Sequence, residues 1–301
     1  MDDAARALGG TRADWLDLST GINASAYPFT QPEPDAWTAL PDTGAVDALT
    51  SAARRFWDVP DSAAILAVPG LSAAIIQIPR LAAPGRVSIP APTYNEHAAS
   101  FATAGWQIGD DDPAAQVIVH PNNPDGRVWS SHDLTAPLRI IDESFCDVMP
   151  DRSLVAHASD GHTLVLKSFG KFWGLAGLRL GFVIGSQTHI DQLAQMLGPW
   201  PVSGPALAIG HQALCDPAWA TAQRAQLQTD AARLDQIFTA AGATLTGGTD
   251  LFRLYTVDNA AHWQDRLAHQ HIWTRIFPYS DTWLRVGLPP AHGWARLEAA
   301  L

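Results

Sequence analysis

The stretch that decides the fold is TLVLKSFGKFWGLAGLRLG, residues 163–181. An apolar run that predicts a buried strand is followed by a glycine-rich turn and, through Arg179, by a second apolar run. Lys167 and Lys171, the only two lysines in a chain with seventeen arginines, both lie here. A genome that favours arginine would explain why lysine is scarce but not why both lysines fall in one segment. The position therefore indicates a chemical use for a lysine.

A lysine and an arginine in this arrangement suit one small anionic cofactor. A lysine that forms an imine must sit on a rigid element and lose its proton near neutral pH. A phosphate group beside it needs an arginine and a hydroxyl, which Arg179 and Ser168 could supply. The glycines do not open a helix after the first strand of a βαβ unit, so a dinucleotide-binding loop is excluded.

Working outward, short apolar runs alternate with helical patterns from about residue 63. This order predicts an α/β fold with a doubly wound, mostly parallel sheet that binds ligands at the carboxyl ends of its strands. We expect an N-terminal arm over 1–43 that packs with the small domain, a large cofactor-binding domain over 44–205, and a smaller α+β C-terminal domain over 206–301. The predicted strands of the large domain are 65–68, 86–89, 117–119, 138–141, 163–166 and 178–184, and its predicted helices are 44–57, 72–82 and 96–104.

Composition excludes several classes of protein. A net charge of −11 argues against nucleic acid and anionic membranes as partners. No apolar run is long enough to span a bilayer, and the acidic start does not resemble a secretory signal, so we expect a cytoplasmic protein. Cys146 and Cys215 are too few for a disulfide framework or a cysteine zinc site, and we expect both to be buried. The histidines show no metal-ligand spacing, so we expect no metal.

Residues 163–181 resemble the lysine signature of fold-type-I pyridoxal-phosphate (PLP) enzymes, the class I and II aminotransferase family. In that family Ser-x-Ser/Thr-Lys is followed by Gly-Leu-x-Gly-x-Arg-x-Gly. The resemblance implies the PLP-dependent transferase fold, a homodimer, and PLP held as an imine by the catalytic Lys171. It assigns the cofactor phosphate to Ser168 and Arg179. Gly170 departs from the pattern, since the family usually has a hydroxyl residue there.

Two loops then match the family in the expected order. HPNNPDG, residues 120–126, resembles its Asn-Pro-rich loop, which implies that Asn123 binds the cofactor's phenolic oxygen and contacts the substrate. Asp142 ends an apolar run and matches the catalytic aspartate that keeps the pyridine nitrogen protonated. From the residues alone, a polar turn and a solvated strand end are the alternatives. Phe145 stands where the family usually has tyrosine.

Two further segments carry weaker signals. Gly70, Leu71 and Ser72 precede a helical pattern and match the family's phosphate-binding glycine loop, although the serine could simply cap the helix. Tyr94 matches the aromatic residue that stacks on the pyridine ring, with an ordinary core tyrosine as the alternative.

The substrate residues are assigned by resemblance as well. Arg285, in WLRVG, matches the arginine that grips the substrate carboxylate, unless it is a surface residue of an edge strand. The segment WLDLSTGIN, residues 15–23, resembles the opening of the threonine-phosphate decarboxylases of cobalamin biosynthesis, which places Gly21, Ile22 and Asn23 in the substrate site. A simple β-turn would also suit these residues.

The resemblance implies a lyase that decarboxylates L-threonine O-3-phosphate to (R)-1-aminopropan-2-yl phosphate, and thus a phosphorylated amino acid as its small-molecule substrate. A class I/II aminotransferase similar to the histidinol-phosphate enzymes is the alternative. Leu40 disfavours it, because those enzymes usually have a tyrosine there that reaches the partner subunit's cofactor. A non-catalytic protein with the same fold is a third hypothesis, disfavoured because the residues that match the family's functional positions are all present.

Overall fold

The computed structural model describes residues 2–301, which divide into two compact units. The larger unit consists of Tyr27–Asn123 and Val128–Ala220. The smaller unit consists of the described residues up to Ala26, together with Pro124–Arg127 and Thr221–Leu301. The division differs from the domain limits expected from sequence, because residues 27–43 of the arm and residues 206–220 belong to the larger unit.

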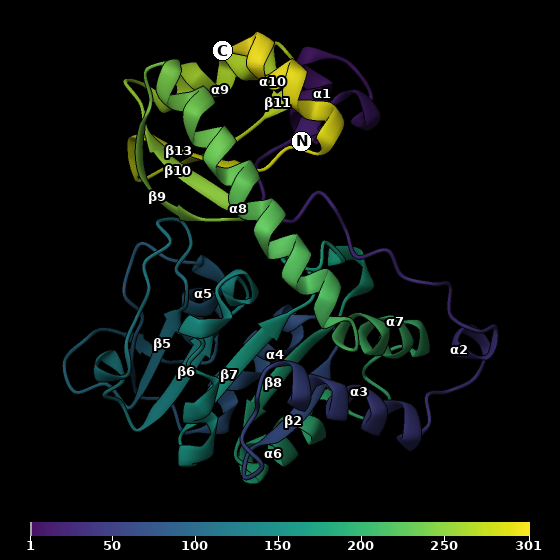
Figure 1. Ribbon diagram of the computed structural model, residues 1–301. Coiled ribbons are helices and arrows are strands. Elements are labelled where there is room, and N and C mark those ends of the chain that lie inside the picture. Colours follow the sequence, from purple (N-terminus) through teal and green to yellow (C-terminus); the bar gives the residue numbers. More distant parts are fainter. Residues whose placement is uncertain (1) are drawn as a thin grey trace. The chain divides into compact units, whose positions relative to one another are not determined.

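The larger unit is built on a seven-stranded sheet within the described part of the chain (Figure 1). The strand order is β2-β8-β7-β6-β5-β3-β4, and neighbours from β7 to β4 are parallel, whereas β8 is antiparallel to both β7 and β2. This confirms the predicted α/β class with a mostly parallel sheet. The strands are β2 Ala64–Val68, β3 Arg86–Ser88, β4 Gln107–Ile108, β5 Ala115–Val119, β6 Leu138–Asp142, β7 Thr163–Ser168 and β8 Gly181–Gly185.

Apolar side chains explain why these segments form the centre of the unit. Every residue of β5 and β8 is buried, as expected of strands covered on both faces. The helices α4, α5 and α6 share a hydrophobic core with the sheet, to which they contribute residues such as Ile75, Phe101 and Leu193. The helix α7 (Gly204–Leu214) packs against α3 (Thr43–Phe56), which explains why the region after residue 205 belongs to the larger unit. The helices are α2 Asp35–Thr38, α3 Thr43–Phe56, α4 Leu71–Gln77, α5 Asn95–Thr103, α6 Gln187–Leu197 and α7 Gly204–Leu214.

Three sequence expectations need correction. The helix predicted over 72–82 changes to a 3₁₀ turn at Ile78–Leu81, because Pro79 cannot continue α-helical hydrogen bonding. The strand predicted over 178–184 begins only at residue 181, because Arg179 adopts the left-handed conformation with φ of 53°. Cys146 is buried as expected, but Cys215 is exposed.

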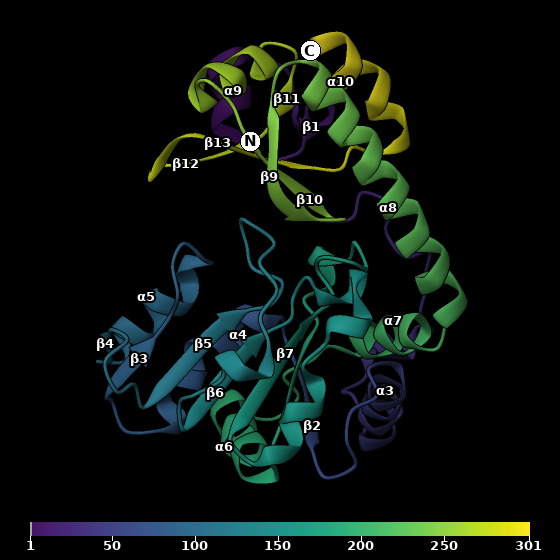
Figure 2. The same ribbon diagram turned by 60° about the vertical axis from the view of Figure 1, so that its left-hand side comes forward.

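The smaller unit has an antiparallel sheet with the order β12-β13-β10-β9 and a short parallel pair, β1-β11 (Figure 2). Through that pair Leu16 of the arm lies beside Ile272, and the arm continues along β13, where the Gly287 amide donates to the Leu18 carbonyl at 2.7 Å. The strands are β1 Leu16–Asp17, β9 Thr244–Thr249, β10 Phe252–Thr256, β11 Ile272–Trp273, β12 Arg275–Phe277 and β13 Ser280–Gly287. The helices are α1 Asp2–Leu8, α9 Ala260–Ala268 and α10 Trp294–Ala300, and α8 Pro217–Ala240 contains the division between the units.

None of the helices in residues 2–301 combines the length and the apolar character needed to cross a bilayer.

Candidate active site

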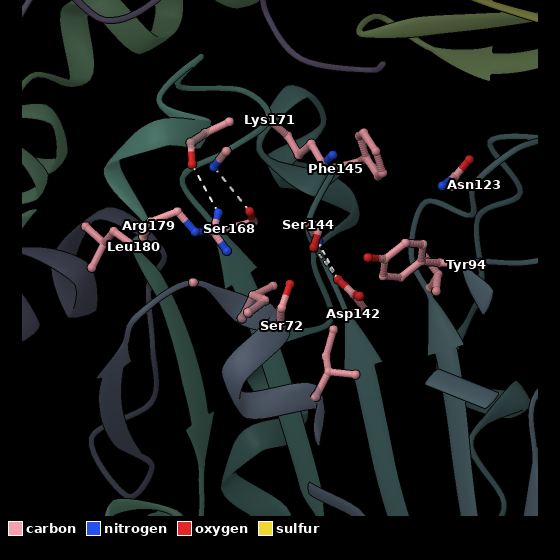
Figure 3. A pocket seen from close by; sticks show the side chains of 16 residues that line it. Ser72, Tyr94, Asn123, Asp142, Ser144, Phe145, Ser168, Lys171, Arg179 and Leu180 are labelled. Carbon is pink, nitrogen blue, oxygen red and sulfur yellow. Dashed lines mark hydrogen bonds between the residues drawn. The ribbon is translucent and has the colours of Figure 1, made fainter. Parts of the chain in front are cut away.

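A pocket of the larger unit opens at the carboxyl ends of three neighbouring parallel strands (Figure 3). Val119, Asp142 and Ser168 are the last residues of β5, β6 and β7, and all three line it. This is where a doubly wound sheet binds its ligand. The pocket is also lined by every residue that the resemblance assigns to the cofactor: Gly70, Leu71, Ser72, Tyr94, Asn123, Asp142, Ser168, Lys171 and Arg179.

One end of the pocket suits a phosphate group. Ser72 and Ser168 supply hydroxyls, and Arg179 supplies a guanidinium whose Nη1 donates to the Ala176 carbonyl at 3.0 Å. Gly70 has a φ of 79°, and a Cβ there would lie 2.5 Å from Arg179 Nη2. The glycine thus keeps open the space that the guanidinium occupies, and the position tolerates no side chain without moving it.

Lys171 lies on a loop whose flanking side chains are deeply buried. Phe169, Phe172 and Trp173 are each 0% exposed, so the loop is anchored on both sides of the lysine. The lysine Nζ lies 5.2 Å from the centre of the Phe145 ring. Figure 3 shows the two side chains next to each other at the pocket. Phe145 therefore offers an apolar surface to the amine where the family usually offers a tyrosine hydroxyl.

Asp142 is buried, 2% exposed, yet has hydrogen-bond donors on both carboxylate oxygens. Ser144 donates to Oδ1 from its hydroxyl at 2.5 Å and from its amide at 3.0 Å, and His97 Nε2 lies 2.8 Å from Oδ2. Burial acts to raise the pKa of Asp142. The hydrogen bond and charge of His97, with the two hydrogen bonds from Ser144, hold that pKa below its usual value. The side chain remains a carboxylate at neutral pH.

Sequence reasoning missed His97, since it considered the histidines only as metal ligands. The ring is 1% exposed and packs edge-on against Tyr94, with centroids 6.0 Å apart. The available signal was spacing: Tyr94 is the N-cap residue of α5, and His97 lies three residues later, in the first turn of that helix. A histidine this close to a predicted ring-stacking residue is a candidate partner for the predicted catalytic carboxylate.

The loop that carries Asn123 is tied to the loop that precedes Tyr94. Asn122 is buried, donates to the Pro92 carbonyl at 3.0 Å and accepts from the Thr93 hydroxyl at 2.6 Å. Asn123 and Tyr94 both line the pocket, and burial raises the pKa of Tyr94. The neighbouring asparagine therefore fixes the loop, while Asn123 faces the site.

The residues assigned to the substrate, apart from Asn123, lie in the smaller unit. Arg285 is 8% exposed, and its Nη2 donates to the Ser19 carbonyl of the arm at 2.7 Å. Burial, with Arg275 nearby, lowers the pKa of Arg285 to about 10, so it remains a cation at neutral pH. Asn23 is buried and accepts from the Ser25 amide at 2.9 Å. Gly21 and Ile22 precede it in the same unit, and the substrate roles of all these residues remain predictions.

The model of the family "Aminotransferase class I and II" matches residues 106–301 of the chain. The chain belongs to this family. It is 41% identical to a threonine-phosphate decarboxylase of Sinorhizobium sp, over 100% of this chain and 96% of that protein. It is 38% identical to a threonine-phosphate decarboxylase of Pseudomonas aeruginosa, over 100% and 95% of the two chains.

Solved structures of the family share the fold. A histidinol-phosphate aminotransferase from Sinorhizobium meliloti, in complex with pyridoxal-5'-phosphate, has a TM-score of 0.82 at 19% identity, covering 100% of this chain and 92% of that one. L-threonine-O-3-phosphate decarboxylase from Porphyromonas gingivalis has a TM-score of 0.71 at 18% identity, covering 95% and 98%. At these identities the likeness confirms the PLP-dependent transferase fold.

The residues of the pocket fit pyridoxal phosphate, the cofactor of this family. Lys171 offers an amine for the aldehyde, and Asp142 offers a carboxylate for the pyridine nitrogen. Ser168 and Arg179 offer a hydroxyl and a guanidinium for the phosphate, and the lack of a side chain at Gly70 leaves the guanidinium its place.

We expect Gly70→Ala to weaken PLP binding about tenfold, which corresponds to about 1.4 kcal/mol. The positive φ disfavours any side chain, and the new Cβ would push the tip of Arg179 out of place. The dissociation constant can be measured by titrating the apoprotein with PLP and following visible absorbance. Gly177→Ala is the matched control, because a Cβ there meets nothing within 4 Å. Equal affinities of the two variants would contradict this account.

We expect His97→Leu to lower the free energy of unfolding by about 2–4 kcal/mol at pH 7, because it removes a donor from a buried carboxylate. The native pKa of Asp142 is depressed, so its stabilising contribution is present above the unfolded value of about 3.9 and is lost as pH falls through the native value. The difference in free energy of unfolding between wild type and variant should therefore become smaller below about pH 4.

Urea unfolding from pH 3 to 8 would measure this difference. His97→Gln is the control, because its amide keeps an N–H donor and should recover part of the loss. A stability difference that stays constant across this pH range would show that His97 acts by packing alone.

Proposed function

We propose that this protein is a PLP-dependent lyase that decarboxylates L-threonine O-3-phosphate to (R)-1-aminopropan-2-yl phosphate in cobalamin biosynthesis. The observation that carries the proposal is the likeness, over the full chain, to two threonine-phosphate decarboxylases at 41% and 38% identity. The N-terminal segment over 15–23, whose resemblance to that group is independent of the lysine signature, supports the same reaction.

The chain supplies groups for each part of this reaction. When bound, PLP supplies an electron sink for the pair released as the bond between Cα and the substrate carboxylate breaks. Asp142, held as a carboxylate, keeps the proton on the pyridine nitrogen that makes the sink effective. Carbon dioxide leaves, and Lys171, in its ammonium form, would return a proton to Cα. Phe145 provides an apolar surface beside the lysine amine.

A substrate with two anionic groups suits the arginines of the smaller unit. Arg275 on β12 lies directly opposite Arg285 on β13 in the antiparallel ladder. Like charges in such a pair repel each other, so this surface of the smaller unit favours an anionic group.

The alternative is an aminotransferase similar to the histidinol-phosphate enzymes, and it has weaker support. Relatives with that name match at 31% identity over 41% of the chain, or at 26% over 70%. Leu40 also lacks the hydroxyl that those enzymes use to reach the partner's cofactor.

Product analysis by NMR tests the reaction directly. We expect PLP-loaded protein to convert O-phospho-L-threonine to 1-aminopropan-2-yl phosphate without any keto acid. Lys171→Ala should abolish turnover, because Lys167 is buried and ion-paired and cannot replace it. Glutamate formed only when 2-oxoglutarate is added, with no aminopropanol phosphate, would establish the aminotransferase instead.

We also propose that the protein is a homodimer in the cytoplasm. In the larger unit the side chains of Trp37, Leu40 and Trp200 are 63%, 67% and 58% exposed. Leu40 lines an apolar groove shared by α2, α3 and α7, together with residues such as Pro41 and Leu207. Exposed aromatic and aliphatic side chains of this size typically mark an interaction surface, and dimers are the rule in this family. We assign the surface to a second copy of the chain.

Sedimentation equilibrium should give twice the chain mass of 32.3 kDa for the wild type. Leu40→Asp should shift the mass toward that of one chain, because it places a charge in the groove. Ile108→Asp, at a position that is 49% exposed on β4, is the matched control and should leave the dimer intact. A monomeric wild type, or equal effects of the two substitutions, would refute this assignment.

A further inference from the structure

A network of buried charged side chains lies behind the strand ends that form the pocket. Lys167 and Glu143 are 2% and 1% exposed and form a close ion pair, and Asp147 Oδ1 lies 3.9 Å from the lysine Nζ. Burial acts to lower the pKa of Lys167, but the charges of Glu143 and Asp147 raise it above its usual value. The lysine is therefore a protonated bridge between two carboxylates.

This network is on the opposite side of the two strands from the pocket. Asp142 and Ser168 line the pocket, whereas Glu143 and Lys167, their neighbours in sequence, do not. Successive side chains of a strand point to opposite faces, so one ion pair can tie the strand ends together without entering the site. The Glu143 amide also donates to the Leu166 carbonyl at 2.9 Å, which extends the β6–β7 ladder to this point.

Glu143 is held in turn by the segment after residue 152. Its Oε2 accepts from the Ser153 hydroxyl at 2.7 Å, and its Oε1 accepts from the Leu154 amide at 2.5 Å. With the ammonium of Lys167, these donors satisfy both carboxylate oxygens. Complete satisfaction is what makes a buried charge compatible with a stable fold.

Asp147 connects the network to the loop that carries Lys171. Its Oδ2 accepts from the indole N–H of Trp173 at 3.1 Å, and its Oδ1 accepts from that of Trp57 at 2.9 Å. Trp173 lies two residues after Lys171 and stacks on Phe169, two residues before it, with ring centroids 5.2 Å apart. The position of the lysine backbone thus depends on an indole that Asp147 holds.

The same region brings His120, Glu143 and Cys146 close enough to hold a metal ion, but their contacts argue against this use. His120 Nδ1 accepts from the Trp129 amide at 3.0 Å, and its Nε2 lies 2.7 Å from the Arg152 carbonyl. Both ring nitrogens are thus occupied, and the ammonium of Lys167 beside Glu143 would repel a cation. The cluster is an element of internal structure.

We propose that Lys167, Glu143 and Asp147 are positioning residues, which act through Trp173 to fix the Lys171 loop and through β6 and β7 to align Asp142 with Ser168. The inference rests on the proposed PLP site but does not depend on which reaction follows. A structural role alone would affect stability. A positioning role also affects cofactor affinity and the protonation of the bound cofactor, because it sets the distance from Lys171 to the groups that bind the ring and phosphate.

Trp173→Phe and Trp57→Phe form a matched pair for the test. Each removes one indole donor from the same carboxylate and keeps an aromatic ring, but only Trp173 lies on the Lys171 loop. We expect both variants to lose thermal stability. Trp173→Phe should also raise the PLP dissociation constant about tenfold and shift the pH midpoint of the bound cofactor's visible absorbance. Trp57→Phe should leave both quantities within about twofold of wild type.

The proposal is overturned if Trp173→Phe binds PLP as wild type does, or if Trp57→Phe weakens binding as much. In either case the network would contribute only to stability. The proposed reaction fails in a different way: wild-type protein would bind PLP with the expected absorbance but would release no carbon dioxide from phosphothreonine. Comparison of the two tryptophan variants would remain decisive in that case.

Discussion

The fully buried Asp142 has to remain a carboxylate, and the larger unit meets this requirement with donors from two residues that lie in different segments. Ser144 follows Asp142 in the chain and donates from its amide and its hydroxyl, while His97 approaches from α5. Without them, burial would favour the neutral acid, which has no charge to hold a proton on a pyridine nitrogen. The chemistry of the pocket therefore depends on how α5 packs against the end of β6.

The polar side chains at the ends of β6 and β7 lie on two faces of the sheet and have different contacts on each face. On one side, Asp142 and Ser168 line the pocket, and on the other side Glu143 and Lys167 join the same two strands. The period of two along a strand makes this division possible, since adjacent residues serve opposite faces. A buried ion pair gives little net stability, but it fixes geometry, because each charge has few other places to find a partner.

Much of the fold, and most of the residues that line the pocket, could be predicted because the signals are local. Apolar runs of strand length predicted the sheet. The spacing of glycine, serine, lysine and arginine in 163–181 predicted residues that line the pocket. The misses come from contacts between distant segments. His97 carries no local sign that its partner is Asp142, 45 residues away. The left-handed turn at Arg179 also has no signature in an arginine, and it displaced the start of β8.

The two lysines of the chain, Lys167 and Lys171, lie in different environments that suit different uses. An aldehyde cofactor reacts with an amine that can lose its proton and reach the carbonyl carbon. Lys167 fails on both counts, since its side chain is 2% exposed and two carboxylates keep it protonated. Of the two lysines in the segment, only Lys171 faces the pocket. Two lysines four residues apart thus have opposite environments. Lys171 lies beside the apolar ring of Phe145, which favours a neutral amine, and Lys167 lies beside carboxylates that keep it charged. Exchanging their environments would remove the nucleophile and leave Glu143 and Asp147 without a buried cation, so the chemistry and the stability of the strand ends depend on the same pattern of burial.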